Sequence, residues 1–193
     1  MPEGELAQKI LLFGTATSVE TAGLRPEIEL IGRVRTGDDE AFGELYRMFA
    51  PMINGVVLAR VARDDVQDIV QDVFLAAYKN LHSLKDDRVF GAWLVKIARN
   101  RAAEWYRTRK PAEELNDTVS TGESRRGEAA EVLRAIRSLS DAYSETLTMR
   151  LVEGMTAKEI AERTGLKPES VRVNLHRGME LLRQRLGIGG EGK

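Results

Sequence analysis

Apolar residues recur along the chain at steps of three and four residues from Glu27 onward. This spacing matches the period of an α-helix, and no stretch of four or more residues shows the clean alternation of a half-buried strand. The pattern therefore predicts an all-α fold. A short first helix is expected to end at Gly37, because glycine adopts the left-handed conformation that ends helices without a steric cost. A second helix carries Ala41 to Phe49, and Pro51 either kinks or restarts it.

The third predicted helix begins at Asp64, whose side chain can cap the free amides while Gln67 reaches back. One side of this helix is apolar, with Val66, Ile69, Val70, Val73, Phe74, Ala77 and Tyr78. The other side carries Asp65, Asp68, Gln71 and Asp72. A row of carboxylates can be a solvated surface or a docking face, and the pattern alone leaves both open.

A loop over residues 80–88 precedes a fourth helix, which combines an apolar stripe with a strong basic bias. The apolar positions are Phe90, Trp93, Leu94, Ile97, Ala98 and Trp105, and we expect Trp93 to pack in the core. The basic positions are Lys96, Arg99, Arg101, Arg107, Arg109 and Lys110, against the single acid Glu104. Trp105 and Tyr106 either pack or stack on unpaired bases.

The periodicity stops between Thr108 and about Glu128, where Pro, Asn, Ser, Thr, Gly and charged residues dominate. Such a composition is typical of a flexible linker. The sequence therefore predicts two small domains, at 27–110 and 129–188, joined by a linker at 111–128. Residues 1–26 form an N-terminal extension that is either disordered or, through Leu6, Ile10, Leu11 and Phe13, a short amphipathic helix. Residues 189–193 form a flexible tail.

The second domain contains a helix-turn-helix pattern. Thr156 and Glu159 make a capping box at one helix start. Gly165 then makes the tight turn, Leu166 plugs it, and Pro168 opens the next helix at its first turn. The side chains expected to face outward on that helix are those that read bases and phosphates in a major groove: Ser170, Arg172, Val173, Asn174, His176 and Arg177. A plain helical hairpin remains the alternative.

Composition narrows the classes of function. The 193 residues include 29 Lys+Arg and 30 Asp+Glu, so any nucleic-acid surface must be local. The absence of Cys excludes disulfide frameworks and thiol catalysis and suits a reducing cytosol. Two His offer little for a zinc site, and we expect no metal or cofactor. No apolar run approaches the ~18 residues of a membrane helix, and the acidic N-terminus is unlike a secretory signal, so a cytoplasmic location is expected.

Several motifs in order resemble the extracytoplasmic-function (ECF) class of bacterial RNA polymerase sigma factors. In the first half they are Gly37-Asp38 with Ala41-Phe42, the run from Asp65 to Phe74, and Phe90-Gly91-Ala92-Trp93-Leu94 continuing through Ile97 to Asn100. In the second half they are Glu153-Gly154-Met155, Glu159-Ile160-Ala161, Gly165-Leu166 and the run from Val171 to Arg177. The resemblance extends from about Glu29 to Leu186, on both sides of the linker.

The resemblance implies a non-catalytic initiation factor whose partners are core RNA polymerase, through its β′ clamp and β flap, promoter DNA, and an anti-sigma factor. The first domain would be sigma region 2 and the second sigma region 4. Docking on the clamp falls to Asp65, Asp68, Gln71 and Asp72. The −10 element would be bound and melted by the loop Leu84, Lys85, Asp86, Asp87 and Arg88, which captures a flipped base, and by Lys96, Arg99 and Asn100. The −35 element would be read by Ser170, Arg172, Val173, Asn174, His176 and Arg177, and polymerase would be needed to open the free protein for DNA binding.

Two other classes of function fit parts of the pattern. A helix-turn-helix regulator that binds duplex DNA without polymerase would need no docking face on a first domain and would usually dimerise. A hydrolase could use the carboxylates Asp64, Asp65, Asp68 and Asp72, with or without a metal. The sequence offers no His-rich or Gly-rich companion for such a site.

Overall fold

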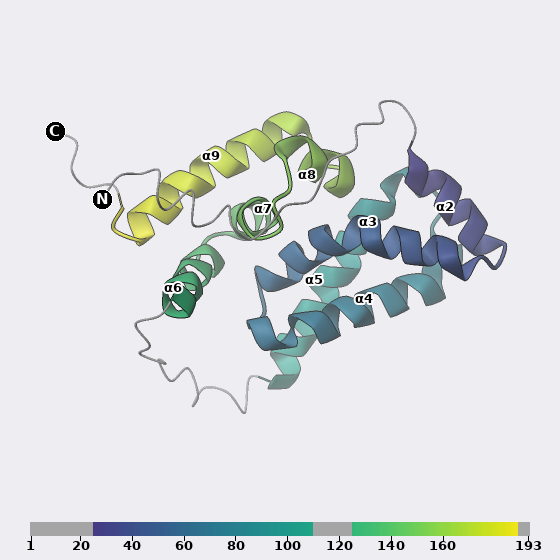
Figure 1. Ribbon diagram of the computed structural model, residues 1–193, viewed down its shortest axis with the longest axis horizontal. Coiled ribbons are helices and arrows are strands. Elements are labelled where there is room, and N and C mark those ends of the chain that lie inside the picture. The colour runs from purple at the N-terminus through teal and green to yellow at the C-terminus, as the bar shows by residue number, and fades with distance from the viewer. Residues whose placement is uncertain (1–24, 110–124, 189–193) are drawn as a thin grey trace.

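The computed structural model describes residues 25–109 and 125–188, and the described part is all-α with no strand, as the periodicity predicts (Figure 1). The expectations for the N-terminal extension, for most of the linker and for the tail concern residues outside these ranges. The first group of helices is α2 (Pro26–Arg35), α3 (Asp39–Leu58), α4 (Val66–Asn80) and α5 (Phe90–Arg109), with short 3-10 turns at Arg63–Asp65, Leu81–Ser83 and Asp87–Val89. The second group is α6 (Arg125–Arg137), α7 (Asp141–Leu151), α8 (Ala157–Thr164) and α9 (Pro168–Arg185).

Local signals set the ends of the first helices. Gly37 takes a φ of 95° just after α2, as the sequence predicts. Asp38 caps α3 by accepting a hydrogen bond from the Ala41 amide at 3.1 Å. Pro51 lies inside α3, which continues without interruption to Leu58. Of the two outcomes considered for this proline, it therefore does not restart the helix.

The predicted start of α4 is wrong. Asp64 lies in a 3-10 turn, the helix begins at Val66, and Asp65 at the N-cap makes no side-chain capping bond. Gln67 donates to Asn54 Oδ1 at 3.3 Å instead of returning to the helix end. The 3-10 turn itself provides an alternative way to start a helix, since its i to i+3 hydrogen bonds satisfy part of the terminal backbone.

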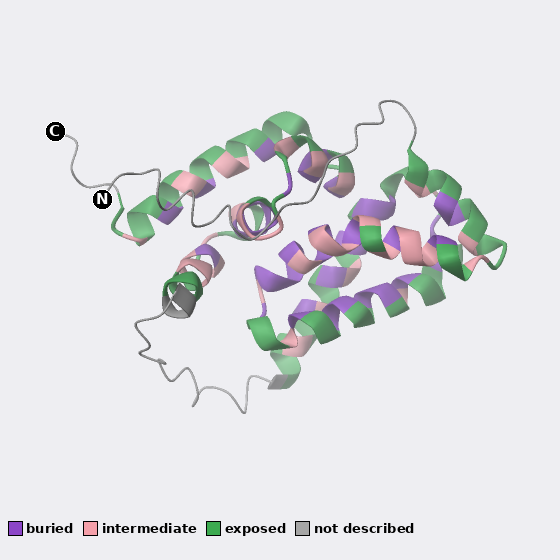
Figure 2. Cartoon of the chain, viewed as in Figure 1, coloured by how far each residue is buried: buried purple, intermediate pink, exposed green. Residues whose placement is uncertain are grey.

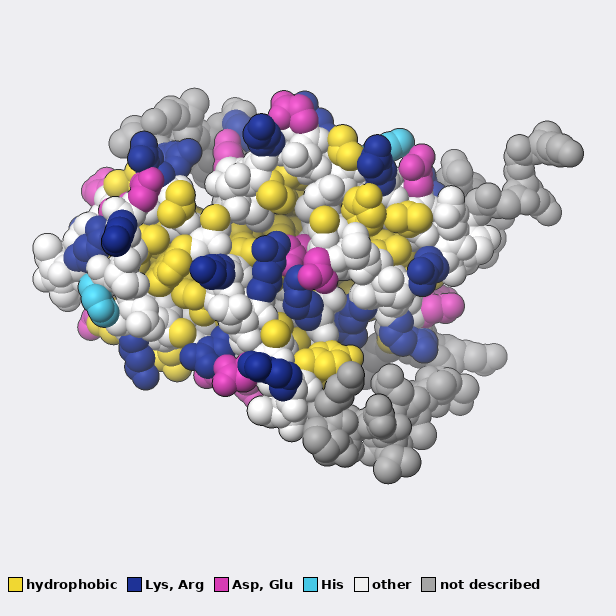
Figure 3. Space-filling view, turned by 180° about the vertical axis from the view of Figure 1, so that it is seen from behind, with side chains coloured by type: hydrophobic (Ala, Val, Ile, Leu, Met, Phe, Trp, Pro, Cys, Tyr) yellow, Lys and Arg dark blue, Asp and Glu magenta, His cyan; other side chains and the backbone are white. Residues whose placement is uncertain are grey.

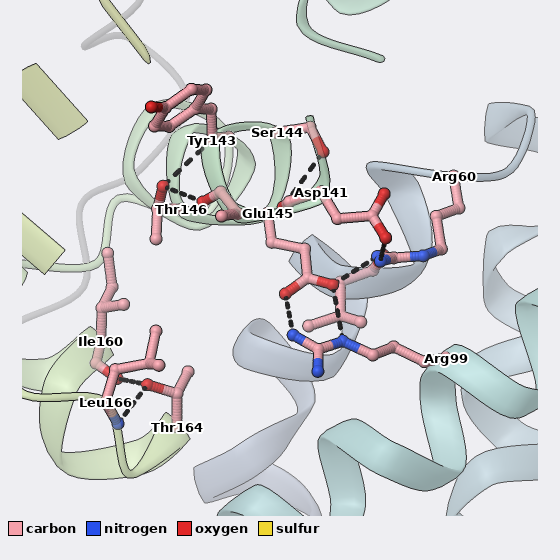
Figure 4. Close-up of polar contacts among 12 residues, drawn as sticks. Arg60, Arg99, Asp141, Tyr143, Ser144, Glu145, Thr146, Ile160, Thr164 and Leu166 are labelled. Carbon is pink, nitrogen blue, oxygen red and sulfur yellow. Dashed lines mark hydrogen bonds and ion pairs between the residues drawn. The ribbon is translucent and has the colours of Figure 1, made fainter. Parts of the chain in front are cut away.

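The helix-turn-helix is confirmed in its main features. Thr156 and Glu159 form the reciprocal capping box, Gly165 has a φ of 76°, and Pro168 occupies the first turn of α9. The expectation that Leu166 plugs the turn is wrong, since this side chain is 41% exposed. The turn is closed by Thr164, whose hydroxyl donates to the Ile160 carbonyl and accepts from the Leu166 amide at 3.3 Å (Figure 4).

The two groups of helices pack directly against each other. Helix α7 lies beside α3, and α8 contacts both α3 and α5. Met149, Met155, Ile160 and Val171 of the second group belong to the same buried cluster as the core of the first group. A smaller separate cluster contains Ile136, Leu147 and Leu182. The described residues therefore form a closed arrangement with one core running through both groups.

Candidate protein and nucleic-acid interfaces

The outer face of α4 is exposed along its length (Figure 2). Asp68, Gln71 and Asp72 are exposed and Asp65 is half-buried at the helix start. Steps of three and four residues place them on one side of the helix. The structure thus brings the four residues expected to bind polymerase onto one continuous surface.

Two apolar side chains extend this surface, and the sequence pattern did not identify either. Leu75 is 56% exposed, and Tyr78, for which the sequence predicts a core position, is 44% exposed. The Tyr78 hydroxyl donates to Asp39 Oδ1 at 2.6 Å, and this bond raises the pKa of Tyr78. The spacing of 68, 71, 72 and 75 could have identified Leu75, because these positions share a helical face. Acidic side chains bordered by exposed apolar ones are suited to a protein contact.

The carboxylates considered for a hydrolase do not form a metal site. Within residues 25–109 and 125–188, no group of three or more His, Cys, Asp or Glu side chains is arranged to hold a metal ion. Asp64, Asp68 and Asp72 are all exposed on an open surface. The geometry provides no reason to place hydrolysis on this face.

The loop expected to capture a flipped base is held by contacts within the first group of helices. Arg35 pairs with Asp87 at 2.7 Å and also donates to the Leu84 carbonyl at 2.8 Å. Asp86 accepts from the guanidinium and the backbone amide of Arg88, and these bonds lower the pKa of Asp86. Leu84 is buried, so its side chain belongs to the core, whereas Lys85 and Arg88 are exposed.

Helix α5 presents the basic surface that the sequence predicts. Lys96, Arg99, Asn100 and Arg107 are exposed. On the face shown in Figure 3, Lys and Arg side chains spread over the middle of the molecule, with acidic side chains among them. Trp93 and Trp105 are half-buried against the core, and Tyr106 is 51% exposed beside Trp105. Core packing is therefore confirmed for Trp93.

One of these basic side chains is engaged by the second group of helices. The Arg99 Nε and Nη2 atoms donate to the two carboxylate oxygens of Glu145 on α7, at 2.9 and 2.8 Å (Figure 4). Arg60 pairs with the same carboxylate at 2.5 Å and with Asp141 at 2.6 Å. The bond to Glu145 raises the pKa of Arg99. The sequence pattern singled out neither Arg60 nor Glu145, because this contact joins segments 46 and 85 residues apart.

Further polar contacts connect the two groups of helices. Arg137 Nε donates to the Leu58 carbonyl at 2.9 Å, and Arg163 donates to the Met48 carbonyl. Asn54 donates to Glu153, whose pKa is raised because burial disfavours the charged form. The closed arrangement is therefore held by several contacts, with Glu145 the most buried carboxylate among them.

The outward face of α9 matches its expected geometry. Ser170, Arg172, Val173, His176 and Arg177 are exposed and Asn174 is half-buried. Val171 is fully buried and Leu175 is half-buried on the inner side, as predicted. The imidazole of His176 lies 3.4 Å from Glu180 one turn later. Within the described residues, Arg172 and Arg177 make no ion pair, so both guanidinium groups are available to contact another molecule.

These features define a two-part all-α protein with a helix-turn-helix in its second part and an exposed acidic helix face in its first. The sequence matches the family models for Sigma-70 region 2 over residues 45–111 and Sigma-70, region 4 over residues 129–182. The chain belongs to the ECF RNA polymerase sigma factors. Members of this family are transcription initiation factors and not enzymes.

Curated relatives align with most of this chain and with nearly all of their own length. The ECF RNA polymerase sigma-E factor of Haemophilus influenzae is 25% identical over 81% of this chain and 93% of its own length. RNA polymerase sigma factor CarQ of Myxococcus xanthus is 29% identical over 80% of this chain and 94% of its own. Among solved structures, CnrH in complex with the cytosolic domain of CnrY is similar, with 27% identity and a TM-score of 0.59 over 86% of this chain and 99% of that one. None of the helices described is long and apolar enough to cross a membrane.

Proposed function

We propose that this chain binds core RNA polymerase, recognises the −10 and −35 elements of its promoters, and promotes DNA melting at initiation. The observation that carries the proposal is the exposed acidic face of α4, which lies in the part of the chain that matches Sigma-70 region 2. A free-standing DNA-binding regulator needs no such face. The basic side of α5 and the outward side of α9 supply the two DNA surfaces.

The proposed division of labour follows the two family matches. Region 2, at 27–110, carries the polymerase contact of Asp65, Asp68, Gln71 and Asp72, which Leu75 extends. It also carries the −10 contact, in which Lys96, Arg99 and Asn100 act with the loop 84–88. Region 4, at 129–188, reads the −35 element through α9, and α6 already begins at Arg125, inside the proposed linker of 111–128.

The proposal includes a protein that restrains the factor. CnrH, to which this chain is similar, was solved with the cytosolic domain of CnrY. Charged and apolar side chains on the same exposed face, such as Asp72 and Leu75, offer a surface that polymerase and a restraining partner could compete for. An anti-sigma factor is the class of partner this surface suits.

A charge reversal on α4 tests the polymerase contact. Asp72→Arg should abolish binding to purified core polymerase in a pull-down, because it places a cation where the docking face is acidic. The fold should persist, since exposed substitutions typically change stability by only about 0.5 kcal/mol. Glu131→Arg, an equal charge reversal at an exposed site on α6, is the matched control and should bind core normally.

Transcription from a promoter library by the reconstituted holoenzyme completes the test. Wild-type chain should direct initiation at a subset of promoters, and Asp72→Arg should direct none. A folded Asp72→Arg that binds core with unchanged affinity would remove the docking assignment. A dimeric wild-type chain that binds a palindromic duplex without polymerase would instead establish the regulator class.

A further inference from the structure

The Glu145 carboxylate is almost completely removed from solvent and is held between two guanidinium groups of the other domain. Its side chain is 6% exposed, against 16% for Arg60 and 49% for Arg99. Both carboxylate oxygens accept from the Arg99 fork, one from each nitrogen, and Arg60 shares one of them (Figure 4). A desolvated carboxylate is retained only where paired charges compensate for its burial.

The surroundings of Glu145 make this pairing part of a wider interface. Helix α7 is buried without interruption from Ser144 to Met149, which is more than one face of a helix. Met149 packs on Gly55 of α3 so closely that a Cβ at residue 55 would lie 2.8 Å from its Cγ. The ion pairs thus lie at the edge of a buried apolar contact between the domains, where electrostatic interactions are stronger than in water.

We propose that Glu145 is an internal lock that closes region 4 onto region 2 and masks Arg99 from DNA in the free protein. This inference rests on the proposed function, because it takes Arg99 to be a −10 contact. Bidentate carboxylate and phosphate contacts use the same edge of a guanidinium group. Arg99 can therefore hold Glu145 or a DNA phosphate in that geometry, but not both.

The lock makes closure and DNA binding mutually exclusive states of one chain. Apparent affinity falls in proportion to the fraction of molecules in the binding-competent state. Anything that separates α7 from α3 and α5 releases Arg99 and Arg60 together. Polymerase, which holds the two regions on separate elements of a promoter under the proposed function, would select the open state.

Two variants break the lock from opposite sides without altering Arg99. Glu145→Gln keeps the shape of the side chain but removes its charge, and Arg60→Met removes the second cation while keeping an unbranched apolar stem. Asp141→Asn is the matched control, because Asp141 also pairs with Arg60 but is 76% exposed, and exposed pairs contribute little. Circular dichroism should show the wild-type helix content in all three variants.

Two readouts measure the lock directly. Because the chain has no Cys, nitroxide labels at Lys79→Cys on α4 and Arg183→Cys on α9 are site-specific and report the distance between the domains. Fluorescence anisotropy measures binding of a labelled random-sequence single-stranded DNA of about 12 nucleotides, a length typical of single-strand sites. Glu145→Gln and Arg60→Met should broaden the distance distribution toward longer values and bind the DNA about tenfold more tightly. For both variants, the plot of the logarithm of the DNA-binding constant against the logarithm of salt concentration should have a slope steeper by about 0.7. The reason is that the released Arg99 neutralises one more phosphate.

Each result decides the proposal. Unchanged distances in both variants, with Asp141→Asn also unchanged, would overturn the lock. Longer distances with unchanged DNA affinity would overturn the masking of Arg99. Either failure is distinct from failure of the proposed function, which shows itself as wild-type chain that supports no transcription with core polymerase.

Discussion

Arg172 lies in the first half of α9 and is exposed. Glu169, an acidic residue, lies three positions before it in the same helix. Glu169 could neutralise Arg172 as a surface ion pair, but no such pair forms among the described contacts. Arg177 is equally exposed but lies about a turn and a half further along the helix. Because the N-terminal part of a recognition helix usually contacts base edges, the two arginines are expected to differ in what they recognise.

Substitution of each arginine should show this difference. Arg172→Ala should reduce the binding free energy for the −35 element by about 1–3 kcal/mol and relax the preference at one −35 base pair. Arg177→Ala should instead weaken binding to all sequences alike and lower the slope of the binding constant's salt dependence by about one. Transcription from −35 variants by the reconstituted holoenzyme measures both. Arg183→Ala, exposed in the last turn of α9, serves as the control. Equal losses at every −35 variant for Arg172→Ala would leave that residue a phosphate contact only.

Helices α8 and α9 could be predicted from short-range signals, and these signals are strong because they act within one turn. In the capping box, the Thr156 amide donates to Glu159 Oε2 at 2.8 Å, and the Glu159 amide donates to the Thr156 hydroxyl oxygen. Burial acts to raise the pKa of Glu159, but the bonds from Thr156 outweigh it and the pKa is lowered. Signals of this kind need no knowledge of the rest of the fold.

Loss of the cap gives a prediction at the scale of the helix. Thr156→Ala should lower the free energy of unfolding by about 1 kcal/mol, because the Glu159 amide loses its acceptor and the Glu159 carboxylate loses the hydroxyl donor. Urea denaturation followed by circular dichroism measures this change. Lys158→Ala, exposed and two residues away, should leave the midpoint nearly unchanged. A Thr156→Ala midpoint equal to that of Lys158→Ala would show that the box adds nothing to α8.

Short-range signals failed where a distant segment competed for the same residue. The capping pattern predicts that Gln67 returns to the start of α4, but it binds Asn54, which also donates to Glu153 of the other domain. Tyr78 follows the apolar stripe of α4 yet turns its hydroxyl to Asp39 at the rim. The helices themselves could be predicted from periodicity, whereas the partner of each polar side chain depends on tertiary placement.

The packing of the two domains is the feature the sequence conceals most. A charged residue such as Glu145 marks a helix face as solvent-exposed in any periodicity pattern, yet this one is buried. Its partners, Arg60 just after α3 and Arg99 on α5, are separated from it in sequence by the linker, so no spacing rule connects them. The candidate DNA and polymerase residues could be named from motifs, but the engagement of Arg99 could not.

The closed arrangement predicts the behaviour of the free protein toward duplex DNA. With a formal net charge of −1 and Arg99 occupied, full-length chain should show no specific nanomolar binding to a promoter duplex in a mobility-shift assay. Addition of core polymerase should produce a specific complex on the same duplex. Tight, sequence-specific binding by the chain alone would contradict both the closed state and the proposed dependence on polymerase.

Gly91 lies where α5 meets α8, and an added Cβ there would overlap the carbonyl oxygen of Arg163. The obstacle is backbone, which cannot rotate aside as a flexible side chain can. A single methyl group at this position would therefore act as a wedge between the domains, independent of any charge. The ability of this chain to fold back on itself depends as much on one missing side chain as on the ion pairs that hold it shut.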